Sequence, residues 1–246
     1  MNNLMPKSWK VKTKPHLFCP GCGHTILLKH LGFLIDEMKI QQQTAFGIDI
    51  GCSLLAWDFY DIDTVQTHHG RVVPVMVGYK FARPERLALA YMGDGAAYAI
   101  GLQSLLHAAL RNSPITVIIV NNENYAMTGG QMSPETLPGT VTTTSPLGKN
   151  EMAGPGLHGP ELVRNVADPK AYIARGSVSN PVLLKTLLKR AIENQINNNS
   201  FSLVEVLSIC PTNWKTDAKS SFERLKSLEN YYSLGEIADV RGKESK

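Results

Sequence analysis

Residues 91–131 read YMGDGAAYAIGLQSLLHAALRNSPITVIIVNNENYAMTGGQ. The pattern predicts a strand that ends at Met92, a Gly-Asp-Gly turn, a helix over Ala96–Arg111 and a second strand over Ile115–Val120, followed by paired asparagines. In open parallel sheets, ligands bind at the carboxyl ends of strands, where a helix N-terminus offers free N–H groups to a phosphate. This stretch therefore indicates both the fold class and the place of a site.

The same alternation of strands and helices continues on both sides of this stretch. We expect helices over His24–Ile40, Val72–Phe81 and Pro181–Asn197, and strands over Thr44–Ile50, Leu87–Met92 and Phe201–Ile209. Alternating elements favour an α/β fold, a mostly parallel sheet with helices on both faces. Between Asn122 and about Glu161 the periodicity is lost, and a loop of this length in a compact domain is usually functional or disordered.

Composition narrows the functional classes. The 246 residues are 43% hydrophobic and 19% charged with a net charge of +4, which is typical of a globular protein. No stretch has the density of basic residues that nucleic-acid binding demands. Met1–Lys14 has no apolar region of a secretory signal, and apolar runs such as Ile115–Val120 are too short to cross a bilayer. We expect a cytoplasmic protein that binds neither nucleic acid nor membranes.

Asp94 favours a metal-diphosphate site over a dinucleotide-binding site. The third glycine of a dinucleotide-binding loop would fall at Tyr98, and the acidic residue expected about twenty positions further on is replaced by Ser113. A carboxylate beside a pyrophosphate is repulsive unless a divalent cation bridges them, and Mg²⁺ typically takes one or two protein oxygens together with phosphates. Asn122 ends the next strand, so Asp94 and Asn122 are expected to meet at one sheet edge.

The four cysteines point to a second site. Cys19 and Cys22 form a C-x-x-C motif before the first helix, whereas Cys52 and Cys210 each follow a predicted strand. A secreted chain would use them in disulfides, and a C-x-x-C motif alone also fits a thioredoxin-like pair. In a cytoplasmic chain, four converging thiolates suit tetrahedral Zn²⁺ or a [4Fe–4S] cluster, and free core thiols are the further alternative. The spacing does not separate these readings.

The Gly-Asp-Gly and Asn pattern resembles the diphosphate-binding half of thiamine-diphosphate enzymes. The resemblance implies that Mg²⁺ is bound by the side chains of Asp94 and Asn122 and by the backbone carbonyl of Asn124. Ala126–Gln131 is similar to a loop that lies over the cofactor. The cofactor contacts that the resemblance implies are Ile50, Gly51, Cys52, Ser53, His69, Gly93, Asp94, Gly95, Ala96, Asn122, Ala126, Met127 and Thr128.

Six motifs in order resemble the β subunit of 2-oxoacid:ferredoxin oxidoreductases of the 2-oxoisovalerate/2-oxoglutarate type. They are Cys19–His24, Gly47–Ser53, Thr67–Arg71, Gly93–Gly95, Thr128–Gln131 and Cys210–Thr212, within roughly residues 15–215. The resemblance implies a [4Fe–4S] cluster on Cys19, Cys22, Cys52 and Cys210 and a catalytic role for His69, while His68 stays unassigned. It also implies one thiamine-diphosphate-binding domain over residues 1–246, with an N-terminal cluster-binding segment (about 15–52) and a C-terminal tail (about 215–246).

The implied reaction is the oxidative decarboxylation of a 2-oxoacid to its acyl-CoA, with electrons passed through the cluster to ferredoxin. An α-type subunit would supply the pyrimidine-side glutamate that this chain lacks, with γ and δ subunits as further partners. The segment Ser53–Trp57 carries no cation, which favours a branched-chain substrate such as 2-oxoisovalerate over 2-oxoglutarate or pyruvate. A nicotinamide-dependent dehydrogenase with a structural Cys₄ zinc is the distant alternative, and the tail is expected to be solvated or packed on another subunit.

Overall fold

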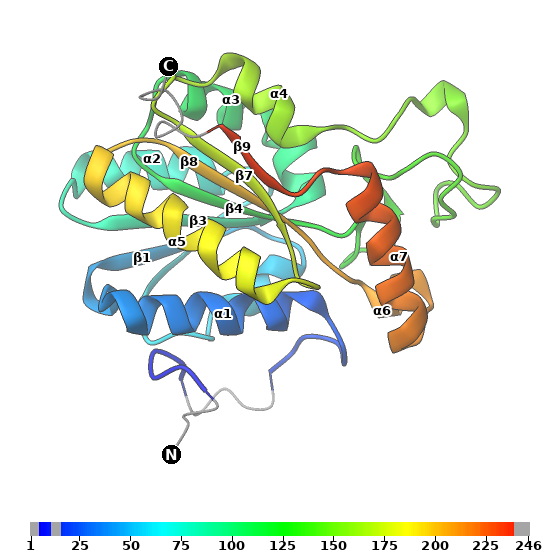
Figure 1. The fold of residues 1–246 in the computed structure, drawn as a ribbon, viewed down its shortest axis with the longest axis horizontal. Helices are drawn as coiled ribbons and strands as arrows, with labels where there is room; N and C mark the ends of the chain where they lie inside the picture. The colour runs from blue at the N-terminus through cyan, green and yellow to red at the C-terminus, as the bar shows by residue number, and fades with distance from the viewer. Residues whose placement is uncertain (1–4, 11–15, 239–246) are drawn as a thin grey trace.

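A parallel sheet organises the computed structural model, which describes residues 5–10 and 16–238. Within these residues, seven strands form one sheet in the order β2-β1-β3-β4-β8-β7-β9 (Figure 1), and β9 alone runs antiparallel to its neighbour. The strands are β1 (Thr44–Ile48), β2 (Asp63–Gln66), β3 (Leu87–Gly93), β4 (Thr116–Asn121), β7 (Tyr172–Ser177), β8 (Ser202–Leu207) and β9 (Gly235–Ala238). A separate hairpin pairs β5 (Asn124–Tyr125) with β6 (Gln131–Met132).

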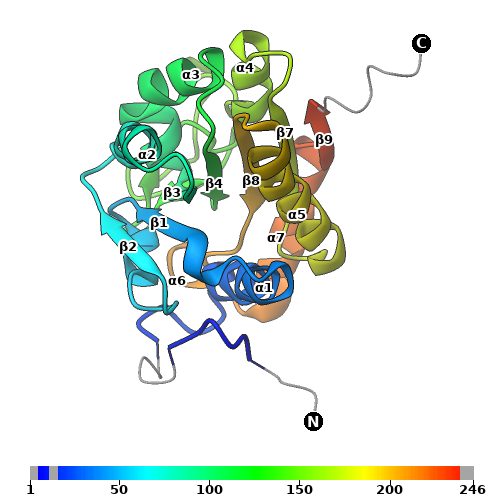
Figure 2. The ribbon, with the colours of Figure 1, turned by 90° about the vertical axis from the view of Figure 1, so that its left-hand side faces the viewer.

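Helices cover both faces of the sheet, as Figure 2 shows edge-on. The helices are α1 (Gly23–Met38), α2 (Val72–Ala82), α3 (Leu102–Leu110), α4 (Gly159–Val166), α5 (Pro181–Asn198), α6 (Pro211–Trp214) and α7 (Ala218–Tyr231). One apolar core lies under α1 and α5, and the other under α2, α3 and α4. Alternate residues of β3 divide between the two cores, with Leu89 and Tyr91 in the first and Ala90 and Met92 in the second. The predicted α/β class is confirmed.

Several boundaries differ from the sequence expectation for local reasons. β1 ends at Ile48 rather than Ile50, because the Asp49 side chain accepts a hydrogen bond from the Ile50 N–H and begins a turn. The helix expected over Ala96–Arg111 is divided into a π-helical turn, Ala96–Ile100, and α3. Gly101 lies at the break, where an added Cβ would come within 3.0 Å of the Gly70 Cα. π-helical turns are frequent at functional sites.

The segment expected to be a tail contributes to the fold instead. Residues after Lys215 form α7, which buries Leu225 and Leu228, and then β9, which pairs with β7. A solvated tail was therefore the wrong interpretation as far as residue 238. Some of the predicted segments lie partly outside the described residues. These parts are residues 239–246 of the predicted tail, the first residue of the cluster-binding segment (about 15–52), and Lys12 and Lys14 of the stretch Met1–Lys14. Within residues 5–10 and 16–238, no helix combines the length and the apolar character needed to cross a bilayer.

Candidate active site

A cavity of about 320 Å³ lies at the carboxyl ends of β1, β3 and β4. Its lining residues come from the segments that follow these strands, from the turn after β2 and from the start of α1. They are His24, Ile50, Gly51, Cys52, Ser53, His69, Gly93, Asp94, Gly95, Ala96, Ile100, Asn122, Asn124, Tyr125, Ala126, Met127 and Thr128. Every residue that the sequence resemblance assigned to cofactor contact is in this set. The sequence interpretation did not assign His24, Ile100 or Tyr125 to it.

Asp94 is a buried carboxylate, with 2% of its surface exposed. Its Oδ2 accepts a hydrogen bond from Ser133 Oγ at 2.7 Å. Burial raises the pKa of Asp94 to about 7, although the hydrogen bond from Ser133 opposes this rise, and the nearby charges of Glu205 and Glu123 raise the pKa as well. A carboxylate in this position would be stabilised by a divalent cation.

The loop after β4 places two asparagines beside Asp94. Asn124 Nδ2 donates to the Asn122 backbone oxygen at 2.6 Å, and the Asn124 N–H points to Asn122 Oδ1 at 3.4 Å. Asn124 Oδ1 is buried and has no hydrogen-bond partner among the described residues. A buried carboxylate together with an unpaired amide oxygen is the donor set that a hard cation such as Mg²⁺ prefers. The side chains of Asp94 and Asn122 and an oxygen of Asn124 thus fit a magnesium-bound diphosphate.

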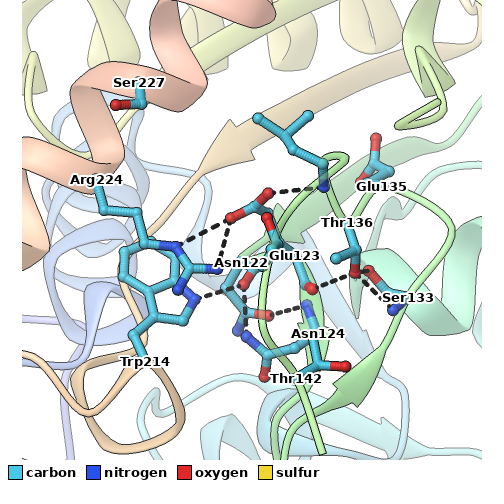
Figure 3. A network of polar contacts seen from close by, with 12 residues as sticks. Asn122, Glu123, Asn124, Ser133, Glu135, Thr136, Thr142, Trp214, Arg224 and Ser227 are labelled. Atoms are coloured by element: carbon cyan, nitrogen blue, oxygen red, sulfur yellow. Dashed lines mark hydrogen bonds and ion pairs between the residues drawn. The ribbon is translucent and has the colours of Figure 1, made fainter. Parts of the chain in front are cut away.

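Glu123 lies between these asparagines, and its hydrogen bonds stabilise the loop (Figure 3). Its carboxylate is buried and accepts hydrogen bonds from the Leu137 N–H at 3.0 Å and from Arg224 Nη2 at 2.9 Å. Trp214 Nε1 donates to the Asn122 backbone oxygen at 3.1 Å, and the Arg224 guanidinium lies 4.3 Å from the centre of the Trp214 ring. Helices α6 and α7 therefore hold the loop in place.

The four cysteines come together on the side of the cavity nearest α1. The Gly23 N–H donates to the Ile209 carbonyl at 3.1 Å, which places Cys22 beside the segment that carries Cys210. None of the four is in a disulfide. Burial, together with the charges of neighbouring cysteines, raises the pKa of Cys22 and of Cys52 to about 12. Among the described residues, no three His, Cys, Asp or Glu side chains converge in the manner of a site for one metal ion.

Two histidines line the cavity in different environments. His24 is buried, its Nδ1 is 2.6 Å from Tyr91 Oη, and burial lowers its pKa to about 3, so it is neutral at physiological pH. His69 is exposed and belongs to a turn that Asp49 anchors, since Asp49 Oδ2 accepts a bond from the Gly70 N–H at 2.8 Å. Burial raises the pKa of Asp49 to about 6. An acidic residue directly after a buried strand was the signal that could have identified Asp49.

The segment expected to contact substrate is mostly directed elsewhere. Ser53 lines the cavity, but Leu55 and Ala56 pack against the core beneath α1, and Trp57 is 48% exposed. The prediction that Ser53–Trp57 forms an apolar substrate pocket was therefore wrong for Leu55, Ala56 and Trp57, which do not line the cavity. The apolar side chains in the lining are those of Ile50, Ile100 and Met127, together with two alanines.

Comparison with known proteins agrees with this geometry. The pattern of the "Thiamine pyrophosphate enzyme, C-terminal TPP binding domain" family matches residues 49–206. The chain belongs to the thiamine pyrophosphate enzymes. It is 39% identical over 95% of its length to the ketoisovalerate oxidoreductase subunit VorA of Methanothermobacter thermautotrophicus, of which it covers 50%. It is 35% identical over 94% of its length to the 2-oxoglutarate synthase subunit KorB of Methanocaldococcus jannaschii, of which it covers 83%.

A solved structure shares the whole fold. The 2-oxoglutarate:ferredoxin oxidoreductase from Magnetococcus marinus, with 2-oxoglutarate, coenzyme A and succinyl-CoA bound, aligns with a TM-score of 0.79 and 25% identity over 97% of this chain and 86% of that chain. The chain spans about half the length of the VorA relatives that it matches. The sequence-based assignment to the thiamine-diphosphate-binding subunits of 2-oxoacid oxidoreductases is confirmed, and the alternative of a nicotinamide-dependent dehydrogenase is wrong.

Proposed function

We propose that the chain is the thiamine-diphosphate-binding and electron-relay subunit of a 2-oxoacid:ferredoxin oxidoreductase. The observation that carries the proposal is a cavity lined by a buried carboxylate–amide oxygen set and by the Cys52 thiol, with the other three cysteines close to Cys52. The oxygen set fits a magnesium-bound diphosphate, and the thiols fit a [4Fe–4S] cluster. The reaction would convert a 2-oxoacid and coenzyme A to an acyl-CoA and CO₂, with two electrons passed to two ferredoxin molecules.

When bound, thiamine diphosphate supplies a carbanion that adds to the 2-oxo carbon and accepts the electrons left by CO₂. The residues of this chain would do the rest. Asp94 and Asn122 would hold the cation, and the N–H groups at the start of the turn Ala96–Ile100 would be available to bind phosphate oxygens. His69, at the exposed rim, would lie near the diphosphate or the substrate. His24 is buried and neutral at physiological pH, and its Nδ1 is paired with Tyr91 Oη, so we assign it to packing.

The cluster would be held by Cys19, Cys22, Cys52 and Cys210. Cys52 also lines the cavity, so a cluster on these thiols would border the cofactor and accept electrons one at a time. Four thiols outside disulfides suit a reducing compartment, which supports a cytoplasmic location. Anaerobic purification followed by iron and acid-labile sulfide analysis tests this assignment. We expect about four of each per chain, whereas one zinc and no sulfide would overturn it.

A branched-chain 2-oxoacid such as 2-oxoisovalerate is the substrate that we propose. Among the described residues that line the cavity, none is Lys or Arg, so a second carboxylate on the substrate would be buried without a partner, at a cost of several kcal/mol. An aliphatic tail instead gains about 0.8 kcal/mol per buried methylene. The relatives named for ketoisovalerate support the same choice. Comparing kcat/KM for 2-oxoisovalerate, 2-oxoglutarate and pyruvate on the assembled complex decides it, and a clear preference for 2-oxoglutarate would overturn this proposal.

A partner subunit would complete the active site. Thiamine enzymes activate the cofactor with a glutamate at the aminopyrimidine, carried by a second domain of similar fold, and the residues that line this cavity include no glutamate. We expect the isolated chain to reduce no dye with any 2-oxoacid, and an added α-type subunit to restore the reaction with coenzyme A and ferredoxin. Turnover by the chain alone would contradict this proposal.

A further inference from the structure

Asn213 lies between the two halves of the site. Asn213 belongs to α6, the short helix that begins directly after Cys210. Its Nδ2 is 3.6 Å from Cys210 Sγ. The same amide group donates to the Ala126 backbone oxygen at 2.8 Å. Ala126 lines the cavity and begins the loop Ala126–Gln131, which the family resemblance implies lies over the cofactor. One side chain therefore contacts both a proposed cluster ligand and the proposed cofactor loop.

The loop is also packed on Asn213. Gly130 has a φ of +83°, a conformation that favours glycine, and a Cβ added there would approach the Asn213 side chain to 3.1 Å. The Gly130 N–H donates to the Tyr125 carbonyl at 3.0 Å, which closes the loop. α6 itself is fixed, since the Trp214 N–H donates to the Cys210 carbonyl at 2.9 Å and the Trp214 ring N–H holds Asn122. Asn213 is thus presented at a defined position.

A hydrogen bond to a cluster-ligating sulfur changes the redox behaviour of the cluster. An N–H donor withdraws charge from the thiolate and stabilises the reduced, more negative cluster, so the reduction potential rises. The bond to the Ala126 carbonyl has a separate effect, because it orders the loop before the cofactor binds and so reduces the entropy lost on binding.

We propose that Asn213 is a positioning residue that links the two centres, raising the reduction potential of the cluster through Cys210 and holding the cofactor loop through Ala126. This inference rests on the function proposed above. It concerns electron transfer out of the cofactor, and it assigns a role to a residue that contacts the cavity only through its neighbours.

The test compares Asn213→Leu, which keeps the shape of the side chain but has no donor, with Asn213→Ser, which is smaller and easily accommodated. Thr212→Ala is the matched control, because Thr212 is exposed on the same helix and takes part in none of these bonds. The full chain is reconstituted anaerobically with iron and sulfide, and its midpoint potential is measured by EPR-monitored redox titration. Thiamine diphosphate binding with Mg²⁺ is measured by calorimetry.

We expect both Asn213 variants to keep four irons, to shift the midpoint potential to a more negative value and to weaken thiamine diphosphate binding by about fivefold, the effect of one hydrogen bond. The control should match the original chain in both readouts. An unchanged potential in both variants, or loss of the cluster from both, would overturn the inference, since a tuning residue leaves the cluster in place. If the original chain itself takes up no cluster, the proposed function fails instead.

Discussion

The two sides of the cavity are built in different ways. The oxygen side comes from the ends of two neighbouring strands, β3 and β4, and its ligands Asp94 and Asn122 are one helix apart in the sequence. The thiol side comes from three distant segments, which carry Cys19 and Cys22, Cys52, and Cys210. The first depends on one local strand–helix–strand unit, whereas the second depends on how α1 packs against the end of β8. We therefore expect the two sides to fail independently.

Replacing one thiol gives the sharpest test of this independence. Cys210→Ser should abolish cluster binding, because the site loses a ligand that only tertiary packing delivers. Iron and sulfide content and the visible absorption spectrum report the loss. Thiamine diphosphate binding should remain within about twofold of the original, since Asp94, Asn122 and Asn124 keep their contacts. Loss of both cofactors together would show that the two sides form a single unit.

The converse change removes the carboxylate. Asp94→Ala should weaken thiamine diphosphate binding in the presence of Mg²⁺ by at least about a hundredfold, because the proposed ligand set then loses its one charged member. The iron content should stay at its original value. Asp61→Ala is the control, since Asp61 is an exposed aspartate outside the cavity. Normal cofactor affinity in the Asp94 variant, measured by titration calorimetry, would refute the assignment.

A glycine at the start of α1 tests the packing that assembles the thiols. In Gly23→Ala, the new Cβ would lie 2.2 Å from Ser208 Oγ and 2.9 Å from the Ile209 nitrogen. We expect a loss of about 1–3 kcal/mol in the free energy of unfolding, together with a reduced iron content. Denaturant unfolding and iron analysis measure both. Gly78→Ala is matched to it, because Gly78 lies in α2 with open space where its Cβ would be, and it should be neutral or stabilising.

The smallest effect that we predict concerns pH. Without a bound cation, the pKa of Asp94 is raised to about 7, and metal binding requires its ionised form. Protons therefore compete with Mg²⁺ below this pKa, and affinity falls as the pH is lowered. We expect Mg²⁺-dependent cofactor binding to weaken about tenfold between pH 8 and pH 6. Asp94→Asn binds more weakly but lacks the titrating group, so a pH dependence as steep as that of the original chain would assign the effect to the diphosphate.

The oxygen side could be predicted from the sequence, and its supports could not. Asp94 and Asn122 follow strands whose apolar runs are plain, so the rule that ligands bind at strand ends locates them, whereas Asn124 was implied by the resemblance alone. Ser133 and Arg224, which contact Asp94 and Glu123, come from a loop without periodicity and from a helix interpreted as a solvated tail. Their contacts depend on tertiary packing, for which local pattern gives no signal.

The strands that the sequence analysis did not predict have a similar explanation. β7 (Tyr172–Ser177) contains Arg175, and a buried arginine interrupts the apolar run that identifies a strand. Its charge is compensated by Glu161 of α4 and Glu205 of β8, at 2.6 and 2.5 Å. β2 and β9 are short edge strands with polar residues, which have little periodicity to detect. Only the resemblance favoured a cluster over zinc at the four cysteines, because their spacing alone left both equally possible.

Glu123 has a φ of +60°, an uncommon conformation for a residue with a side chain, and it lies between the two asparagines of the oxygen side. The hydrogen bonds to Leu137, Thr136 and Arg224 hold it there without any cofactor. The hydrogen bonds formed during folding therefore offset the free-energy cost of this backbone conformation before any cofactor binds. Cofactor capture then requires no slow rearrangement, so association should be fast and differences in affinity among variants of this loop should appear mainly as differences in residence time.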